Sequence, residues 1–182
     1  MPTPELIQTA YDRGAATYDD RFEPLQRPKY AALLGPTGER LSGVASCLDA
    51  GCGTGLLGAF LREHDRAPEL LVGVDLSREM LLRARARGVI GVQADLVGLP
   101  FADGAFDAVV SVTALGLVAG QRERALAELA RVLAPGGLMA VSVLEEHANR
   151  AFTQALRGSG VRIEEVLPCG AQDIGYVGRR TP

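Results

Sequence analysis

The chain has 182 residues, of which 47% are hydrophobic and 23% are charged, and its formal net charge at pH 7 is −3. This length is typical of one domain and too short for a large second one. The weak negative charge disfavours nucleic acid and anionic membranes as partners. The apolar runs are of strand length, and no cationic segment followed by an apolar core stands at the N-terminus, so we expect a cytoplasmic protein.

Neither the arginines nor the cysteines indicate a nucleic-acid or metal site. Arg83, Arg85 and Arg87 stand two residues apart, so on a helix they do not share a face, and we expect them to be solvated. The three cysteines are an odd number without C-x-x-C spacing, which predicts free thiols and no metal. They are Cys47, Cys52 and Cys169.

The first predicted element in chain order is a helix within residues 3–22. Spacings of seven and four residues put the rings of Tyr11, Tyr18 and Phe22 on one helical face. Residues 1–40 are therefore expected to form an N-terminal helical segment. Its aromatic face either closes over a ligand as a lid or packs on the domain core, and the sequence leaves both open.

Short apolar runs alternate with helical patterns through the core, residues 45–182, as expected of successive βα units. Strands are predicted at residues 45–50, 70–75, 89–94, 106–111 and 138–144. One amphipathic helix carries Leu56, Leu57, Phe60 and Leu61, and another carries Leu126, Leu129, Ala130 and Leu133. Ser77 is placed to cap the helix after the second strand, and Pro135-Gly136-Gly137 should end the helix before the fifth.

The pattern changes after residue 147 to a helix followed by two extended segments, residues 161–167 and 172–179. A glycine-containing connection joins them, which predicts an antiparallel pair at one edge of the sheet. The whole pattern predicts a single α/β domain of residues 1–182. Its expected form is a Rossmann-like three-layer sandwich with a mostly parallel sheet and an antiparallel C-terminal hairpin.

The segment from Cys47 to Leu57 carries the strongest functional signal, because a strand runs into a glycine-rich turn and then into a helix. Gly51, Gly53 and Gly55 permit backbone torsions with φ > 0 and lack Cβ atoms, so a flat, charged ligand can approach the main chain closely. The turn is therefore expected to cradle a nucleotide-like ligand. A tight βα turn without a ligand is the alternative.

Two ligand classes fit this turn. Residues 53–58 match G-x-G-x-x-G with Asp75 about twenty positions later, as in a dinucleotide site. Asp49 and Asp95 favour S-adenosylmethionine (SAM), because a nicotinamide site needs neither. At the end of the second strand Asp75 can accept both ribose hydroxyls, and at the end of the third Asp95 can accept the adenine amino group. The alternative for both is a carboxylate stabilised at a helix N-terminus.

Five ordered motifs resemble those of one enzyme family. They are Leu48-Asp49-Ala50-Gly51-Cys52-Gly53-Thr54-Gly55, Val74-Asp75-Leu76-Ser77 with Met80-Leu81, Ala94-Asp95, Phe106-Asp107-Ala108-Val109-Val110-Ser111, and Leu133-Ala134-Pro135-Gly136-Gly137. Over nearly its whole length the chain is similar to class I SAM-dependent methyltransferases of the small type-11 domain group. Its opening Tyr11-Asp12-x-x-Ala15-x-x-Tyr18-Asp19 is similar to quinone-biosynthesis methyltransferases and to the methyltransferase-like protein of the Williams-Beuren region.

This resemblance implies a seven-stranded sheet ending in a reversed hairpin, with SAM as cofactor and S-adenosylhomocysteine (SAH) as product. It also implies that Gly51 and Gly53 face the methionine part. Met80 and Leu96 would then face the adenine, and Ser111 the methionyl edge. The expected cofactor-binding residues are Tyr18, Asp49, Gly51, Gly53, Asp75, Leu76, Met80, Asp95, Leu96 and Ser111.

The sulfonium of SAM already activates the methyl group, so in-line transfer to a small-molecule acceptor needs positioning and exclusion of water rather than a metal. His147, directly after the fifth strand, is the candidate base, with a solvent-facing helix cap as the alternative. The acceptor pocket is expected to be formed by Tyr11, Phe22, Thr113, Leu115 and Leu117. A peptide or protein end remains an alternative acceptor.

Two other functional classes stay open on the sequence. One is a non-catalytic SAM-binding partner or sensor, which would bind SAM and SAH without methylating anything. The other is a nicotinamide-binding Rossmann enzyme, which NADH would stabilise. The expected assembly is a monomer or a homodimer.

Overall fold

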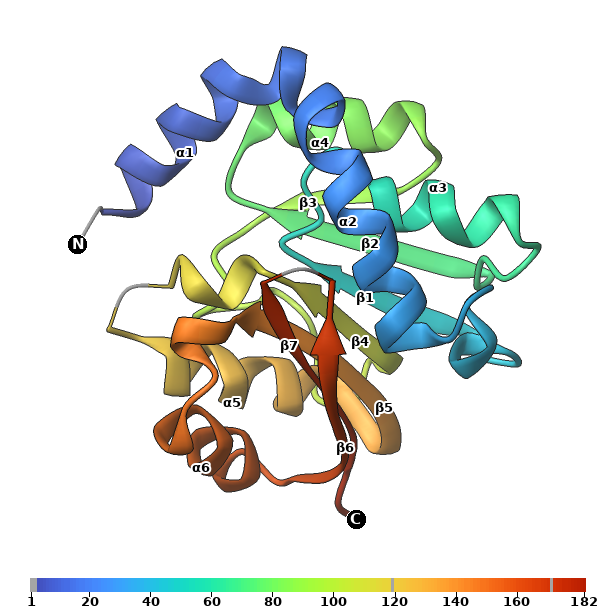
Figure 1. Cartoon of the computed structure of the whole chain (residues 1–182), viewed down its shortest axis with the longest axis vertical. Helices are drawn as coiled ribbons and strands as arrows, with labels where there is room; N and C mark the ends of the chain where they lie inside the picture. The colour runs from blue at the N-terminus through green and yellow to red at the C-terminus, as the bar shows by residue number, and fades with distance from the viewer. Residues whose placement is uncertain (1–2, 119, 171) are drawn as a thin grey trace.

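The fold is built on one twisted sheet, seen in a computed structural model that describes residues 3–118, 120–170 and 172–182 (Figure 1). Within these residues the sheet has seven strands in the order β3-β2-β1-β4-β5-β7-β6. The strands are β1 (Ser46–Ala50), β2 (Leu70–Asp75), β3 (Ile90–Gln93), β4 (Phe106–Val112), β5 (Leu133–Leu144), β6 (Val161–Cys169) and β7 (Asp173–Arg180). The strand order reverses between β1 and β4, and ligands of open α/β sheets bind outside the carboxyl ends of the strands at such a point.

Strand pairing confirms the predicted mostly parallel sheet with an antiparallel C-terminal hairpin. β1 pairs in parallel with β2 and β4, and the outer pairs β2–β3 and β4–β5 are parallel too. β7 runs antiparallel to both of its neighbours, β5 and β6. The seven-stranded α/β Rossmann-like fold expected from the family resemblance is therefore confirmed.

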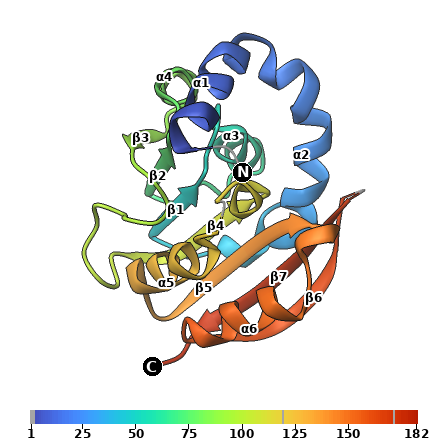
Figure 2. The same cartoon turned by 90° about the vertical axis from the view of Figure 1, so that its left-hand side faces the viewer.

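Helices cover both faces of the sheet, as the turned view shows (Figure 2). The α-helices of the described residues are α1 (Pro4–Gly14), α2 (Tyr18–Leu34), α3 (Leu56–Glu63), α4 (Arg78–Ala86), α5 (Arg122–Val132) and α6 (Arg150–Gly158). Strand side chains alternate between two apolar clusters, because Cβ atoms alternate across a strand. Val109 packs with the α5 and α6 side, whereas its neighbours Ala108 and Val110 pack with the α2 and α3 side.

The beginning of β5 differs from the prediction. The helical pattern was extended to Leu133 and the strand was expected from residue 138, but α5 ends at Val132 and Leu133 already pairs with Phe106 of β4. Pro135-Gly136-Gly137 lies inside the strand, where the β4–β5 register shifts. A proline cannot donate a ladder hydrogen bond, and an irregularity of this kind accommodates it.

The N-terminal segment consists of two helices rather than one. A short 3₁₀ turn, Ala15–Thr17, separates α1 from α2. α1 contains no buried residue and contacts α4, whereas α2 buries five side chains against the domain. These are Gln26, Lys29, Tyr30, Leu33 and Leu34. α2 is therefore part of the domain core, and only α1 lies wholly on the surface.

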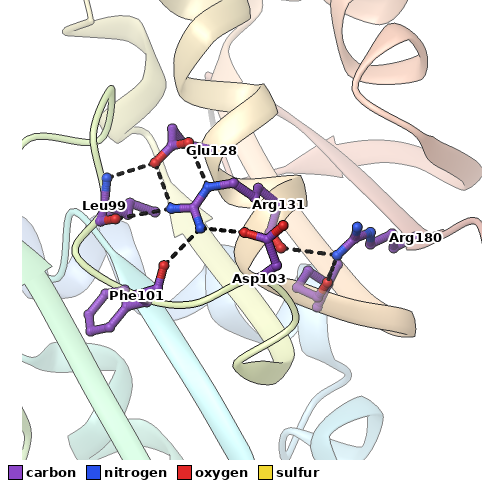
Figure 3. Close-up of polar contacts among 7 residues, drawn as sticks. Leu99, Phe101, Asp103, Glu128, Arg131 and Arg180 are labelled. Carbon is purple, nitrogen blue, oxygen red and sulfur yellow. Dashed lines mark hydrogen bonds and ion pairs between the residues drawn. The ribbon is translucent and has the colours of Figure 1, made fainter.

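Arg131 of α5 fixes the long connection between β3 and β4 (Figure 3). Its guanidinium donates to the carbonyls of Leu99 and Phe101 at 3.0 and 2.8 Å. It also pairs with Glu128 and Asp103, each at 2.8 Å, and these two carboxylates raise its pKa. The connection is thereby held against α5 in its second half, shortly before β4 begins.

Within the described part of the chain, no helix is both long and apolar enough to cross a membrane. All three cysteines are free and buried, and burial raises the pKa of each thiol. Their thiols therefore stay protonated, consistent with packing roles.

Candidate active site

A cavity of about 730 Å³ lies at the carboxyl ends of the strands and is bordered on its outer side by α1 and α2. Its volume is within the range of small-molecule and cofactor sites. Most of the predicted site residues line it together. They are Tyr11, Tyr18, Phe22, Gly51, Gly53, Asp75, Leu76, Asp95, Leu96, Thr113, Leu117 and His147.

The glycine turn after β1 forms the floor of the cavity on its β1–β2–β3 side. The N–H groups of Gly51 and Cys52 both donate to the carbonyl of Val74, at 2.8 and 2.9 Å, which folds the turn tightly over β2. Gly51 has φ +79°, and a Cβ there would stand 2.3 Å from the Cβ of Ala114. Gly53 has φ +51°, so a side chain there would be strained although space exists. A side chain is therefore sterically excluded at Gly51, and glycine is favoured by its torsions at Gly53.

Asp75 ends β2 beside this turn, and the protein backbone orients its carboxylate. One oxygen accepts the N–H of Gly53 and the other accepts the N–H of Ser77, both at 2.9 Å. Burial raises the pKa of Asp75, and the two backbone hydrogen bonds counteract part of this rise. An ionised carboxylate oxygen has two lone pairs and can accept two hydrogen bonds, so Asp75 can still accept from ligand hydroxyls in the cavity.

Four predicted residues lie behind the cavity wall, so the structure corrects their placement. Asp49 is 4% exposed, and Met80, Ser111 and Leu115 are fully buried. The hydroxyl of Ser111 donates to the carbonyl of Ala50, which ties β4 to β1. Met80 follows the Ser77 cap into the interior, and Leu115 packs in the core cluster that includes α5. In this arrangement, these side chains could influence a ligand only through the residues of the wall or through charge.

Asp49 retains an electrostatic connection to the site. Burial, with a further contribution from the charge of Asp75, raises the pKa of Asp49 to about 7. A cation placed in the cavity would favour ionisation of both carboxyls.

The aromatic side chains of the N-terminal segment meet over the cavity as predicted. The ring centroids of Tyr11 and Tyr18 are 6.2 Å apart, and those of Tyr18 and Phe22 are 4.6 Å apart. The Tyr18 ring covers Gly53, since a Cβ at that glycine would lie 3.8 Å from the ring. Burial is the main reason that the pKa of Tyr18 rises to about 12, so its hydroxyl remains a hydrogen-bond donor at neutral pH.

Polar contacts attach this segment to the domain. Asp19 accepts the hydroxyl of Thr54 and pairs with the Arg87 guanidinium at 2.7 Å, and Arg87 also donates to the Thr54 carbonyl at 2.8 Å. Asp12 accepts the hydroxyl of Ser77. The sequence had suggested a solvated Arg87. Its partner is 68 residues away, which no local spacing reveals.

A polar network that sequence reasoning missed lies in the other half of the cavity. The ammonium of Lys29 stands 2.8 Å from a carboxylate oxygen of Asp173 and 2.8 Å from the hydroxyl of Thr113. The second Asp173 oxygen accepts the hydroxyls of Thr113 and Ser142. The sequence does contain a pattern that could have indicated this network. Residues 26, 29, 30, 33 and 34 have the i, i+3, i+4, i+7, i+8 spacing of a buried helical face, and they form such a stripe on α2. Its first two members are polar, which marks an unusual buried face.

His147 lies where it was predicted, in a short turn directly after β5, and lines the cavity. Its side chain is 31% exposed. The imidazole packs over Gly116, since a Cβ added there would lie 3.1 Å from its Cδ2 atom. A role as a base stays a prediction.

Comparisons with known proteins place the chain in a family. The sequence pattern described as a methyltransferase domain matches residues 48–141. A malonyl-[acyl-carrier protein] O-methyltransferase of Pectobacterium atrosepticum is 35% identical over 155 residues, covering 83% of this chain and 58% of the relative. A demethylmenaquinone methyltransferase of Thermus thermophilus is 42% identical over 127 residues, covering 66% and 56%. The chain thus spans less than two thirds of the length of these relatives.

A solved structure agrees in fold. A SAM-dependent methyltransferase from Thermotoga maritima superposes with a TM-score of 0.73 at 20% identity, covering 94% of this chain and 99% of the other. The cavity fits the cofactor of such proteins, because a tight glycine turn and a backbone-oriented carboxylate face one pocket of suitable volume. The chain therefore belongs to the class I SAM-dependent methyltransferases of the type-11 methyltransferase-domain family.

Proposed function

We propose that this protein transfers the methyl group of SAM to a small-molecule acceptor by direct in-line displacement. The observation that carries the proposal is one continuous cavity with two chemically different halves. One half has the glycine turn and Asp75, and the other has Lys29, Thr113 and His147. A single volume of about 730 Å³ gives both reactants a place side by side.

The half above β1, β2 and β3 would hold the cofactor. Gly51 and Gly53 would lie along its methionine part, Asp75 would accept the ribose hydroxyls, and Asp95 with Leu96 would border the adenine. The bound cofactor supplies an electrophilic methyl group on a positively charged sulfur. The protein itself then has to orient the acceptor and keep water out, and the aromatic side chains of α1 and α2 would serve that purpose.

The half above β4, β5 and β7 would hold the acceptor. Phe22, Leu117 and Val118 give it apolar walls, and His147 borders it. The relatives named above act on malonyl-[acyl-carrier protein] and on demethylmenaquinone, two chemically different acceptors. Their names therefore leave the acceptor of this chain open. An acceptor attached to a carrier would enter the cavity through its opening to solvent, where Leu25 and Leu117 are exposed.

Thermal unfolding with SAM, SAH, NADH and no ligand tests the proposal first. A ligand that binds only the folded state raises its stability by RT ln(1 + [L]/Kd), which is about 2.7 kcal/mol at a hundredfold excess over Kd. We expect SAM and SAH to raise the melting temperature and NADH to leave it unchanged. Stabilisation by NADH alone would contradict the proposal, and binding of SAM without methyl transfer across an acceptor screen would favour the non-catalytic alternative.

A further inference from the structure

Two polar side chains occupy positions on α2 that normally belong to the core. Gln26 and Lys29 are each only 8% exposed, and both line the cavity. They begin the stripe whose other members, Tyr30, Leu33 and Leu34, pack against the domain. A buried ammonium is unfavourable unless it is paired and hydrogen-bonded, so the position of Lys29 calls for a specific reason.

The surroundings hold the Lys29 ammonium in one place. Asp173 pairs with it at 2.8 Å, and Thr113 accepts from it at 2.8 Å. Asp173 is itself fixed by the hydroxyls of Thr113 and Ser142, and the Thr113 N–H donates to the Ser142 hydroxyl at 3.1 Å. An ammonium has three N–H groups. Within the described residues its hydrogen-bond acceptor is Thr113 and its contact with Asp173 is an ion pair, so the ammonium keeps donor capacity for a ligand in the cavity.

Backbone strain at Thr113 indicates that this arrangement is not incidental packing. Thr113 has φ +65°, a left-handed conformation that is rare for a β-branched residue. The conformation places its hydroxyl between Lys29 and Asp173. Strain of this kind persists where the surrounding structure over-determines it, and it is concentrated at functional sites.

The position in the sheet assigns the network to the acceptor half. Thr113 follows β4, Ser142 belongs to β5 and Asp173 begins β7, on the side of β1 away from β2 and β3. Ala114, the next residue after Thr113, touches the space above Gly51. The network therefore adjoins the glycine turn without being part of the cofactor half.

A second observation also indicates a ligand here. The side-chain oxygen of Gln26 is buried, yet it has no hydrogen-bond partner among the residues that the structure describes. Buried polar atoms of native proteins are nearly always paired. At the mouth, by contrast, Leu25 and Leu117 line the cavity and are 51% and 39% exposed. A carboxylate has no N–H or O–H to give the Gln26 oxygen, so affinity for an anionic end comes from Lys29, and the exposed leucines favour an apolar body.

We propose that Lys29 selects the methyl acceptor through a carboxylate, and that the acceptor is an amphiphilic carboxylic acid. This inference rests on the proposed function. Lys29 would hold one carboxylate oxygen and leave the other to react. Transfer to that oxygen forms an O–CH₃ bond while the S–CH₃ bond breaks and its electron pair stays on sulfur, so the anion becomes a neutral methyl ester. Because the oxygen is already ionised at pH 7, the reaction needs no base to remove a proton.

Binding of a matched pair of probes tests the inference without knowledge of the natural acceptor. Hexanoate and hexanamide have the same apolar chain, and only hexanoate is charged. With the protein saturated with SAH at pH 7.5, we expect NMR titration to show hexanoate binding at least about tenfold more tightly. Removing Lys29 alone would leave Asp173 buried and unpaired, so the variant of choice is Lys29→Met combined with Asp173→Asn. It should abolish the preference, and Lys29→Arg should preserve it.

Arg27→Met is the matched control, because Arg27 lies on the same helix and pairs on the surface with Glu63. It should leave the preference unchanged. A protein that fails to bind SAH would overturn the proposed function itself. A protein that binds SAH but does not distinguish hexanoate from hexanamide, or a Lys29→Met/Asp173→Asn variant that keeps the preference, would overturn only the role of Lys29.

Discussion

Asp49 and Asp75 belong to neighbouring strands, and their two carboxyls respond differently to burial. Asp75 faces the cavity and is stabilised by two backbone N–H groups, whereas Asp49 is enclosed behind the wall. The different environments suit the two carboxyls to different roles at this end of the sheet. Asp75 is suited to contact a ligand directly, and Asp49 is suited to respond to the charge of what binds.

Replacing Asp75 with asparagine should weaken SAM binding by about 1 to 3 kcal/mol, the range for losing charge-assisted hydrogen bonds. An amide offers one acceptor oxygen instead of two, so the two backbone N–H groups and the ribose would compete for it. Isothermal titration calorimetry measures the change. Glu69→Gln, an exposed carboxyl just before the opposite end of β2, is the matched control and should bind SAM normally. Unchanged affinity in the Asp75 variant would reject the ribose role.

The raised pKa of Asp49, about 7 in the folded protein, predicts a pH dependence of stability. Its pKa in the unfolded chain is the ordinary one, so the folded state binds the proton more tightly. The stabilising contribution is therefore complete below about pH 4 and is lost as the pH rises through about 7, with a slope of at most about 1.4 kcal/mol per pH unit.

Asp49→Asn removes this titration. Without ligand, the stability of the wild type relative to this variant should fall between pH 5 and pH 8, as measured by urea unfolding at each pH. A constant difference over that range would contradict the raised pKa.

At the scale of elements, α1 and α2 differ in kind although both line the cavity. α2 packs on the core, while α1 is attached to the domain by its own Asp12, which accepts the hydroxyl of Ser77. Asp19, at the start of α2, adds the contacts to Thr54 and Arg87. The packing interpretation of the N-terminal segment therefore fits α2, and a lid role for α1 stays a prediction.

Asp19→Asn should loosen the start of α2 from the glycine turn and accelerate release of SAM. The variant weakens the contacts to Thr54 and Arg87, and we expect affinity to fall by about 1 to 2 kcal/mol, mainly through the dissociation rate. Stopped-flow displacement of SAM by excess SAH measures that rate. The neighbouring Asp20 is exposed, so Asp20→Asn serves as control and should release SAM at the wild-type rate. Equal rates in both variants would show that the Asp19 contacts do not retain the cofactor.

For the whole molecule, the Arg131 contacts join the β3–β4 connection to α5 (Figure 3). α5 packs in the apolar cluster on the opposite face of the sheet from α2. Arg131→Met should lower the free energy of unfolding by about 1 to 3 kcal/mol, because the carbonyls of Leu99 and Phe101 lose a charged donor. Asp103→Asn should change it by less than about 1 kcal/mol, since that carboxylate is 73% exposed. Urea midpoints at unchanged m-value measure both. A larger effect at Asp103 would contradict this ranking.

Local sequence patterns were enough to predict the sheet and the residues of the glycine turn, because both depend on neighbouring residues. Apolar periodicity marks strands and helices, and positions such as Gly51 and Gly53 require torsions that glycine adopts readily. Local patterns also placed the aromatic rings of Tyr11, Tyr18 and Phe22 together, although a turn after Gly14 divides the helix that was expected there.

Which side chains reach the cavity depends on long-range packing, which local patterns do not record. Met80 belongs to a motif of the family, and Leu115 was predicted to line the acceptor pocket. The packing of their elements nevertheless turns both side chains into the interior. Conversely, Lys29 meets Asp173 across 144 residues of chain, and Arg87 meets Asp19 across 68. Such contacts depend on where α2 packs relative to β7 and to the end of α4, and a pattern of local spacing carries no information on that placement.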